Sequence, residues 1–251
     1  MKNKKTTLRK LLLVLAIFSF ISCKTTEIFL SIGQSNMAGR GEMAATDTIP
    51  QKNIFLFNDK DEWEPAKNPL NRYSTIRKKM SMQKLGPSWS FAQTLADTDK
   101  KVGLVVNVKG GTRIDQWKKG GEFYNEAVKR TLKAQEKGVL KGIIWHQGEG
   151  DRGKWEVYTQ KFTDFITHLR KDLNAPNVPV IVGEIGNWRG TSDSINKVLL
   201  NLKKHVENLG AVKATDLMHK GDSVHFDRAS QIILGKRYAK KYLELTSKNK
   251  D

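Results

Sequence analysis

The stretch EIFLSIGQSNMAGRG, residues 27–41, joins a short apolar run to a turn that is rich in small and polar residues. The apolar part is typical of a strand buried on both faces. Gly33, Gln34, Ser35 and Asn36 then stand where a core would contain apolar side chains. Ser35 is therefore either an ordinary turn or helix-capping residue, or a hydroxyl held at the end of a strand in order to react.

The same apolar pattern recurs along the chain and alternates with amphipathic segments. Nearly continuous apolar, β-branched runs predict buried parallel strands at 27–32, 101–108, 141–147, 178–185 and 211–216. Apolar residues at three- and four-residue spacing predict helices at 88–97, 122–138, 155–173, 192–210 and 227–245, the last capped by Asp227. Strands that alternate with helices indicate an α/β fold with right-handed crossovers.

The length of 251 residues suits a single domain, which we place at residues 27–246. We expect a three-layer α/β/α sandwich around a central parallel sheet of about five strands. The segment 42–87 is the least regular part of the chain, and its NIFLFN could form an extra short strand. A long insertion of this kind is more often functional or mobile than structural.

The first 22 residues have the features of an export signal. A basic start is followed by LLLVLAIFSFIS, an apolar run of 12 residues that is too short to span a bilayer comfortably. Ser22 and Cys23 follow directly, which resembles a bacterial lipoprotein signal whose cysteine is lipidated. We expect a periplasmic or cell-surface lipoprotein, anchored by lipid in the outer or cytoplasmic membrane. An ordinary cleaved signal, giving a secreted protein, and an uncleaved anchor are the alternatives.

The chain carries a formal net charge of +18, and it keeps 39 basic and 26 acidic residues, or +13, once residues 1–22 are left out. Such a charge favours anionic surfaces, nucleic acid among them. The lysines are scattered or in short pairs, however, and they form no basic stripe interleaved with aromatic residues. We therefore interpret the charge as a solvated face and expect no nucleic-acid partner.

In an open parallel sheet, ligands bind beyond the carboxyl ends of the strands. Polar and glycine-rich segments follow each predicted strand, namely Gly33–Asn36, Gly110–Arg113 with Trp117, His146–Asp151, Gly186–Arg189, and Asp216 followed by the loop 219–227. These segments should converge on one edge of the sheet, and this edge is where we expect the functional site.

A serine nucleophile needs a base that takes its proton, and the base needs a carboxylate that orients it. Asp222 stands three residues before His225 in a loop ahead of the last helix, and this spacing can aim both side chains the same way. An Asp-x-x-His pair also occurs often by chance. His146 is equally compatible with a core or a site position, and His219 has no obvious partner.

Four motifs, GQSNMAGRG, GGTRIDQW, WHQGEGD and DSVH, together resemble the SGNH hydrolase superfamily in their order and approximate spacing. The likeness covers residues 28–240 and is greatest to the branch of sialate O-acetylesterase-like proteins and acetylxylan esterases. It implies a serine ester hydrolase on a flavodoxin-like three-layer fold, without a metal or organic cofactor. Ser35 would be the nucleophile, His225 the general base and acid, and Asp222 the residue that orients His225.

The resemblance also implies an oxyanion hole, which stabilises the charge that develops on the ester carbonyl oxygen. Its donors would be the backbone N–H of Ser35, the N–H of Gly111, and the side-chain amide of Gln147. Gly110 is a close alternative to Gly111.

Further residues are expected to support the site or the substrate. Gln34 adjoins the nucleophile, and Glu149 would bond N–H groups of the loops around it. A metal site made of His146, Glu149 and Asp151 is disfavoured because only one histidine is present. Arg113 would either face the substrate or form a surface ion pair.

The sequence as a whole predicts an esterase that removes acetyl groups from a carbohydrate such as xylan, an O-acetyl sialic acid or another acetylated glycan. One of Trp89, Trp117 and Trp188 is expected to contact this ligand. A catalytically silent, glycan-binding lipoprotein with the same fold is the alternative.

The lipoprotein hypothesis predicts that Cys23→Ser abolishes lipid labelling, because the thiol that would carry the lipid is absent. The variant should move from the membrane to the soluble fraction when cells are fractionated. Unchanged retention in the membrane fraction would contradict the hypothesis.

Overall fold

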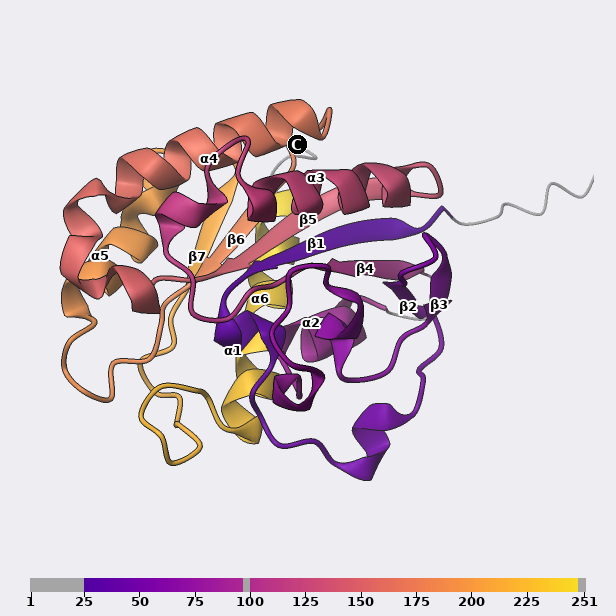
Figure 1. Ribbon diagram of the computed structural model, residues 1–251, viewed down its shortest axis with the longest axis horizontal. Helices are drawn as coiled ribbons and strands as arrows, with labels where there is room; N and C mark the ends of the chain where they lie inside the picture. The colour runs from indigo at the N-terminus through magenta and orange to yellow at the C-terminus, as the bar shows by residue number, and fades with distance from the viewer. Residues whose placement is uncertain (1–24, 97–99, 248–251) are drawn as a thin grey trace, which may run out of the picture.

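The computed structural model describes residues 25–96 and 100–247, and its centre is one seven-stranded sheet (Figure 1). The predicted signal at residues 1–22 and Cys23 lie outside the described residues. The strands are β1 Glu27–Gly33, β2 Ile54–Phe57, β3 Trp63–Pro65, β4 Val102–Val106, β5 Val139–His146, β6 Val180–Gly183 and β7 Leu209–Val212. They lie in the order β3-β2-β4-β1-β5-β6-β7, and all neighbours are parallel except the edge strand β3, which is antiparallel to β2.

Helices cover both faces of this sheet. The α-helices are α1 Ser35–Ala38, α2 Pro87–Leu95, α3 Glu122–Gln135, α4 Tyr158–Asp172, α5 Asp193–Asn201 and α6 Arg228–Ser247. Short 3₁₀ segments connect them, at η1 Ala45–Thr48, η2 Leu70–Tyr73, η3 Met80–Met82, η4 Ile114–Trp117, η5 Glu149–Val157 and η6 Leu202–Lys204. The predicted three-layer α/β architecture is confirmed.

The five predicted strands form β1, β4, β5, β6 and β7. Numbered among themselves along the chain, they take the spatial order 2-1-3-4-5, which is the flavodoxin-like order. The possible strand in NIFLFN is present as β2. The third residue of β3 is Pro65, which is tolerated at a sheet edge, and so short a strand has no periodicity to detect. The sheet is therefore wider than the five strands expected.

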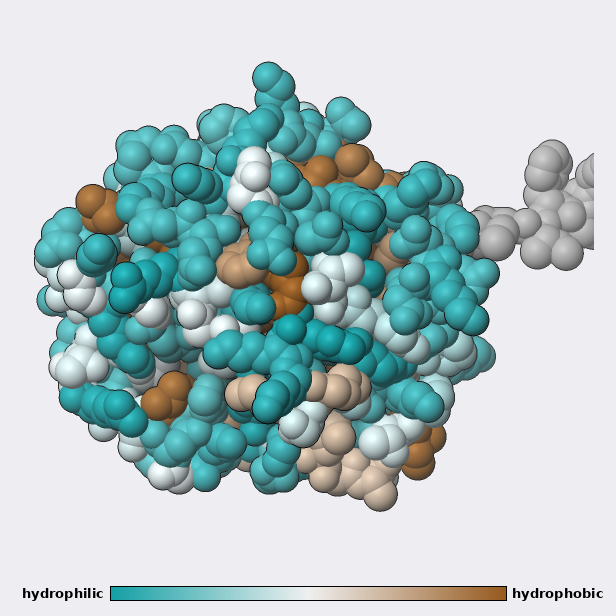
Figure 2. All heavy atoms as spheres, in the orientation of Figure 1, coloured by the Kyte–Doolittle hydropathy of each residue, from teal (hydrophilic) through white to brown (hydrophobic). Residues whose placement is uncertain are grey.

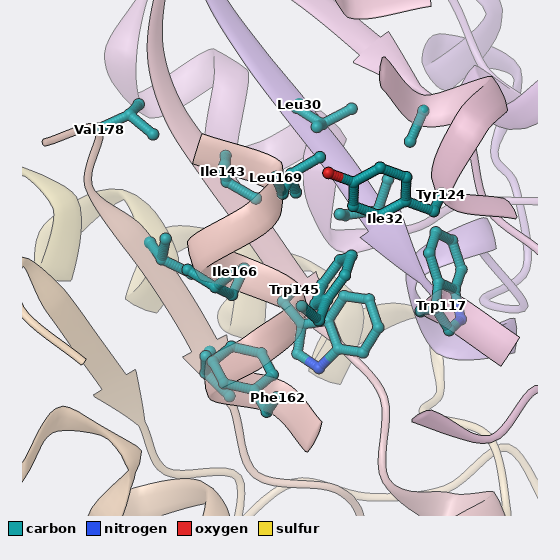
Figure 3. Close-up of a cluster of buried hydrophobic side chains, with 14 of the residues drawn as sticks. Leu30, Ile32, Trp117, Tyr124, Ile143, Trp145, Phe162, Ile166, Leu169 and Val178 are labelled. Atoms are coloured by element: carbon teal, nitrogen blue, oxygen red, sulfur yellow. The ribbon is translucent and has the colours of Figure 1, made fainter. Parts of the chain in front are cut away.

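Two apolar clusters hold the layers together. Between the sheet and helices α3, α4 and α5, Trp117 and Trp145 pack edge-on with ring centroids 5.2 Å apart (Figure 3). Trp145 and Phe165 are tilted at 5.0 Å, and Tyr158 stacks on Phe162. On the other face, Phe29 of β1 packs between Phe91 of α2 and Tyr242 of α6. Each fully buried side chain of this size contributes about 1.5–3 kcal/mol relative to an exposed one.

The helix predictions are correct in position but not in every boundary. The N–H of Ser230 donates to the Asp227 carboxylate at 2.8 Å, which confirms the predicted cap of α6. The predicted helix at 192–210 instead ends at Asn201, continues as η6, and gives way to β7. Asn208 adopts a φ of +50°, a conformation that interrupts a helix although the apolar spacing continues through it.

The face of the molecule seen in Figure 2 is mostly hydrophilic, and its apolar side chains are scattered. Within residues 25–96 and 100–247, no helix combines the length and the apolar character that crossing a membrane requires.

Candidate active site

Ser35 lies at the carboxyl end of the central strand β1, where the chain turns into α1 (Figure 1). The neighbouring strands β4 and β5 lie on opposite sides of β1, and ligands bind at such a switch point in flavodoxin-like sheets. The turn is pinned to β5, because the N–H of Gln34 donates to the carbonyl of His146 at 2.9 Å. A Cβ on Gly33 would lie 2.2 Å from that same oxygen, so a side chain has no room there.

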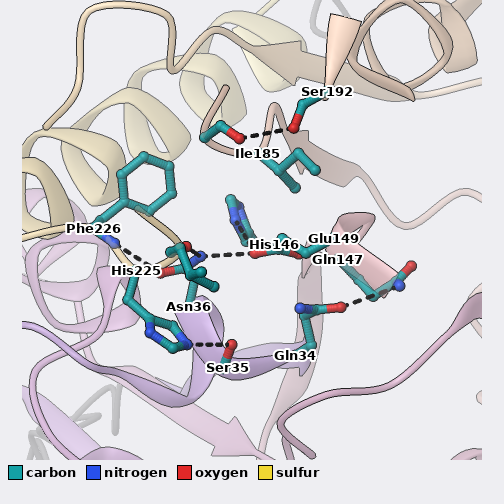
Figure 4. Close-up of polar contacts among 12 residues, drawn as sticks. Gln34, Ser35, Asn36, His146, Gln147, Glu149, Ile185, Ser192, His225 and Phe226 are labelled. Carbon is teal, nitrogen blue, oxygen red and sulfur yellow. Dashed lines mark hydrogen bonds and ion pairs between the residues drawn. The ribbon is translucent and has the colours of Figure 1, made fainter. Parts of the chain in front are cut away.

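A continuous series of hydrogen bonds joins Ser35, His225 and Asp222. The imidazole Nε2 of His225 lies 3.0 Å from the hydroxyl oxygen of Ser35 (Figure 4). Its Nδ1 lies 2.7 Å from Oδ2 of Asp222. Since an ionised carboxylate can only accept, Nδ1 carries the proton in the neutral ring and Nε2 accepts from the serine hydroxyl. The structure thus brings together the three side chains expected to react, in an arrangement that can transfer the hydroxyl proton.

The Asp222 carboxylate is held in its charged form. Partial burial alone would raise the pKa of this carboxyl, but the N–H of His225, its imidazole and the N–H of Val224 all donate to it, and together they lower the pKa to about 2. Asp222 therefore remains ionised at every pH at which a histidine can act as a base, so it keeps orienting the ring over that whole range.

The loop that carries the base has its own internal order. His219, for which the sequence suggested no partner, accepts hydrogen bonds at Nδ1 from the N–H groups of Gly221 and Ser223, at 2.9 and 3.1 Å. The N–H of Lys220 donates to the carbonyl of His225 at 2.9 Å. The histidine thus shapes the turn on which Asp222 stands.

Asn36 connects the turn that carries Ser35 to the loop that carries His225, and the sequence analysis did not include it among the site residues. Its side chain is fully buried; Nδ2 donates to Oε1 of Glu149 at 2.7 Å and to the carbonyl of Val224 at 3.2 Å. Its Oδ1 accepts from the N–H of Phe226 at 3.0 Å (Figure 4). The bonds to Val224 and Phe226 flank His225, so the amide sets the position of the base relative to Ser35.

We had expected Glu149 to bond N–H groups of the surrounding loops. Its carboxylate instead accepts a hydrogen bond from the side-chain amide of Asn36. Only 5% of the Glu149 side chain is exposed, and Oε1 lies 3.7 Å from Nε2 of His146. Burial would raise the pKa of Glu149, but the facing His146 imidazole and the Asn36 amide outweigh it and lower the pKa. His146 is itself fully buried, with Nδ1 2.7 Å from the hydroxyl oxygen of Tyr238. It belongs to the support of the site and not to its surface.

The expectation that Gln147 supplies an oxyanion-hole amide is wrong for this structure. Its side chain is fully buried, and Nε2 donates to Oδ2 of Asp151 at 2.6 Å and to the carbonyl of Thr112 at 3.0 Å. The Tyr158 hydroxyl donates to its Oε1 at 2.8 Å. Both amide hydrogens therefore have acceptors within the protein, and the side chain ties the end of β5 to the segment after β4.

A cavity of about 440 Å³ opens beside Ser35 and His225. It is lined by Gln34, Ser35, Arg40, Lys78, Met82, Gly110, Gly111, Arg113, Glu149, Gly150, Arg152, Val224 and His225. Lys78 and Met82 show that the irregular segment 42–87 forms part of the wall, as its length had suggested. Arg113 is exposed at the cavity and forms no ion pair with a described residue, so the alternative of a surface ion pair is not seen.

Donors of several kinds face this cavity. The N–H groups of Ser35, Gly110 and Gly111 donate to no carbonyl in the described turns and loops. Gly111 has a φ of +75°, which favours glycine, and a Cβ built on Gly110 would lie 3.5 Å from Cβ of Ser35. Gln34 accepts from Gln147 at 3.3 Å through Oε1, and no described residue accepts from its Nε2.

The predicted tryptophan contact is not found at this cavity. Trp89 and Trp117 are buried in the two apolar clusters, and Trp188 packs edge-on against Phe226 while its N–H donates to the carbonyl of Leu217. None of the three lines the cavity. Across the part of the chain that the structure describes, no group of three or more His, Cys, Asp or Glu side chains could hold a metal ion.

Residues 25–244 match the family described as carbohydrate esterase, sialic acid-specific acetylesterase. The chain belongs to this family. Membership of this family makes the protein a carbohydrate esterase.

Two relatives illustrate the likeness. A probable carbohydrate esterase of Arabidopsis thaliana is 32% identical over 239 residues, which cover 86% of this chain and 90% of that protein. The crystal structure of that plant protein superposes with a TM-score of 0.80 over 88% of this chain and 98% of its own. A carbohydrate acetylesterase from Xanthomonas citri, 17% identical, has a TM-score of 0.66 over 88% of this chain and 57% of its own, which shows the shared fold.

The Asn36 contacts predict that Asn36→Ala loosens the loop that carries His225. The variant leaves the N–H of Phe226 without its acceptor, so hydrogen–deuterium exchange at residues 224–226 should become faster. Loss of a buried hydrogen-bonding partner should also lower the free energy of unfolding by about 1–3 kcal/mol. Asn201→Ala, which removes an exposed amide of α5, is the matched control. It should change neither the exchange rate at residues 224–226 nor the free energy of unfolding. Identical exchange in both variants would contradict the role given to Asn36.

Proposed function

We propose that this carbohydrate esterase removes acetyl groups from glycans through Ser35, His225 and Asp222. The observation that carries the proposal is the continuous hydrogen-bond series from the Asp222 carboxylate to the Ser35 hydroxyl, at the edge of a cavity large enough for an acetylated sugar residue. A hydroxyl activated by an oriented imidazole is the arrangement that acyl transfer to serine requires.

In the first half of the reaction, Oγ of Ser35 attacks the acetyl carbonyl carbon while Nε2 of His225 takes the hydroxyl proton. The tetrahedral intermediate collapses, the bond between the acyl carbon and the sugar oxygen breaks, and the imidazolium returns the proton to that oxygen. In the second half, water attacks the acetyl–serine ester with His225 again as the base, and acetate leaves. Asp222 stabilises the imidazolium in both halves because it stays ionised.

The oxyanion hole in this proposal is formed by the N–H groups of Ser35 and Gly111 and by the side-chain amide of Gln34. Gln34 takes the place first given to Gln147, because its Nε2 has no acceptor among the described residues and its side chain lines the cavity. Each donor aimed at the developing oxyanion lowers the barrier by about 2.7–4 kcal/mol. The three donors together account for a large part of the rate enhancement.

The acetylated substrate could be a hemicellulose such as xylan, an O-acetyl sialic acid or another acetylated glycan. If the chain is exported and anchored through Cys23, as proposed, the enzyme would meet these glycans outside the cytoplasm. The rival proposal is a catalytically silent, glycan-binding lipoprotein. Binding alone would not require the hydrogen bond between Ser35 and His225, so the proposal leaves this bond unexplained.

The mechanism predicts that Ser35→Ala lowers kcat/KM for 4-nitrophenyl acetate by about 10³-fold or more, because the nucleophile is absent. Ser247→Ala, at the exposed end of α6, should keep wild-type activity. Acetate release from a panel of acetylated glycans should likewise be lost in Ser35→Ala and kept in wild type and Ser247→Ala. If wild type and Ser35→Ala are equally inert and both bind polysaccharide, the silent-binder proposal is correct instead.

The revised oxyanion hole predicts different results for two glutamines. Gln34→Met keeps the side-chain length but removes the donor, and it should lower kcat about 10²–10³-fold with little change in KM. Gln147→Met removes one of the donors to Asp151, which keeps the N–H of Ile114, and it removes the donor to the Thr112 carbonyl, so it should mainly lower the free energy of unfolding. Steady-state kinetics and urea unfolding of both variants separate the two roles. A Gln34→Met enzyme with wild-type kcat would refute the assignment.

A further inference from the structure

The cavity beside Ser35 is strongly positive. Four of the residues that line it form what we call the basic rim, namely Arg40, Lys78, Arg113 and Arg152. The single acidic residue in the lining is Glu149, whose carboxylate is nearly buried and bonds the Asn36 amide. Within the cavity, therefore, four cations face the space in which the glycan would lie, and one carboxylate is turned away from it.

The side chains of the basic rim have no carboxylate partner among the described residues. Arg152 donates to the Ser192 hydroxyl at 2.8 Å and to the carbonyl of Glu149 at 3.4 Å, both of them neutral acceptors. Elsewhere, three arginines pair with acids, as Arg72–Glu64, Arg228–Asp47 and Arg237–Asp216, whereas four others donate to backbone carbonyls, namely Arg77, Arg130, Arg170 and Arg189. What distinguishes the basic rim is that four cations without an ion-pair partner among the described residues line one cavity, beside Ser35.

Arg40 is the most informative member of the rim, because it is 95% buried and still lacks an acid. The hydrogen bond found for its guanidinium is from Nη1 to the carbonyl of Gly39, at 2.6 Å. A Cβ built on Gly110 would lie 3.0 Å from Nη2 of Arg40 and 3.5 Å from Cβ of Ser35, so the guanidinium and the nucleophile border the same turn. A buried cation is costly without a counter-charge, and an anionic ligand would supply one.

The four cations come from separate segments that the fold brings together. Lys78 belongs to the insertion 42–87, and its Nζ lies 3.2 Å from the point where a Cβ on Gly111 would stand. Arg113 follows β4, and its Cγ lies 3.1 Å from the corresponding point on Gly150. The rim therefore borders both glycine turns that flank the reactive serine.

We propose that the basic rim is an anion subsite that binds the carboxylate of an acidic, O-acetylated sugar, so that the enzyme prefers acidic to neutral acetylated glycans. The inference rests on the proposed function, since it concerns the same cavity. A planar carboxylate matches a guanidinium fork, whereas a lysine contributes a compact charge whose direction is less critical. A neutral glycan such as acetylxylan leaves all four cations without a counter-charge.

The test compares substrates that differ only in the acidic group. One pair is an O-acetylated sialic acid and its carboxyl methyl ester. The other is an O-acetylated methyl glucuronoside and the corresponding neutral glucoside. In at least one pair, kcat/KM should be about tenfold higher for the acid at low salt, and the advantage should shrink as sodium chloride is added. The pair that shows the effect tells whether the carboxylate of a sialic or of a hexuronic acid is bound.

Variants then assign the effect to the rim. Lys78→Gln and Arg113→Gln should each lower the ratio of acid to neutral kcat/KM by up to about fivefold, as expected for partly exposed ion pairs, and more in combination. Lys79→Gln removes the same charge from the adjacent residue, which does not line the cavity, and should leave the ratio unchanged. A ratio that falls equally in Lys79→Gln would show a general charge effect and would overturn the subsite.

The failure of this inference can be distinguished from the failure of the proposed function. If 4-nitrophenyl acetate is hydrolysed but acids and neutral partners react equally at low salt, the subsite is wrong and the esterase proposal stands. If no ester is hydrolysed, binding decides the matter: free sialic and glucuronic acids, titrated by calorimetry, should bind wild type more tightly than the double variant Lys78→Gln/Arg113→Gln. Equal or absent binding would overturn the subsite.

Discussion

The hydrogen bond between Ser35 and His225 joins two residues that stand 190 positions apart in the chain, and the rest of the site depends on it. A contact of about 3 Å between two loops cannot be maintained by the loops alone. Here the strand β1 delivers Ser35, and the buried amide of Asn36 bonds the backbone on both sides of His225. Glu149 accepts a hydrogen bond from Asn36, and its carboxylate lies 3.7 Å from the imidazole of the buried His146 at the end of β5. Ser35 and His225 are therefore positioned by a buried polar layer that is itself anchored to the sheet.

Electrostatics has a different role at each depth of the site. In the buried layer, the facing His146 imidazole and the Asn36 amide lower the pKa of Glu149, so its carboxylate stays ionised and available as an acceptor for Asn36. At the surface, hydrogen bonds keep Asp222 ionised, so that the imidazole always has its counter-charge. Around the cavity, by contrast, the positive charges are unmatched. The first two arrangements position Ser35, His225 and Asp222, and the third faces the proposed binding site.

Much of the fold could be predicted because its signals are local. Apolar runs and amphipathic periodicity located the five central strands and their helices. Asp227, a residue type that caps helices, predicted the start of α6. The motifs also drew attention to Ser35, Asp222 and His225, which the structure brings into one hydrogen-bonded series. Gln147 was assigned the wrong role, since an amide next to a glycine-rich turn can point into a cavity or away from it. Its partners Asp151 and Tyr158 decide the direction, and their positions relative to Gln147 depend on how the chain folds around the end of β5.

The sequence by itself determined the layers of this protein, the strand that ends at Ser35, and the motifs that contain Ser35, Asp222 and His225, because each of these has a signal in a short stretch of the chain. Only the tertiary structure decided which groups are neighbours. It placed Trp89, Trp117 and Trp188 outside the lining of the Ser35 cavity, and it made Asn36 the link between two loops. It also brought four cations that have no ion-pair partner among the described residues from four segments to one cavity. Such neighbourhoods depend on contacts between residues far apart in the chain, for which a linear pattern has no signal.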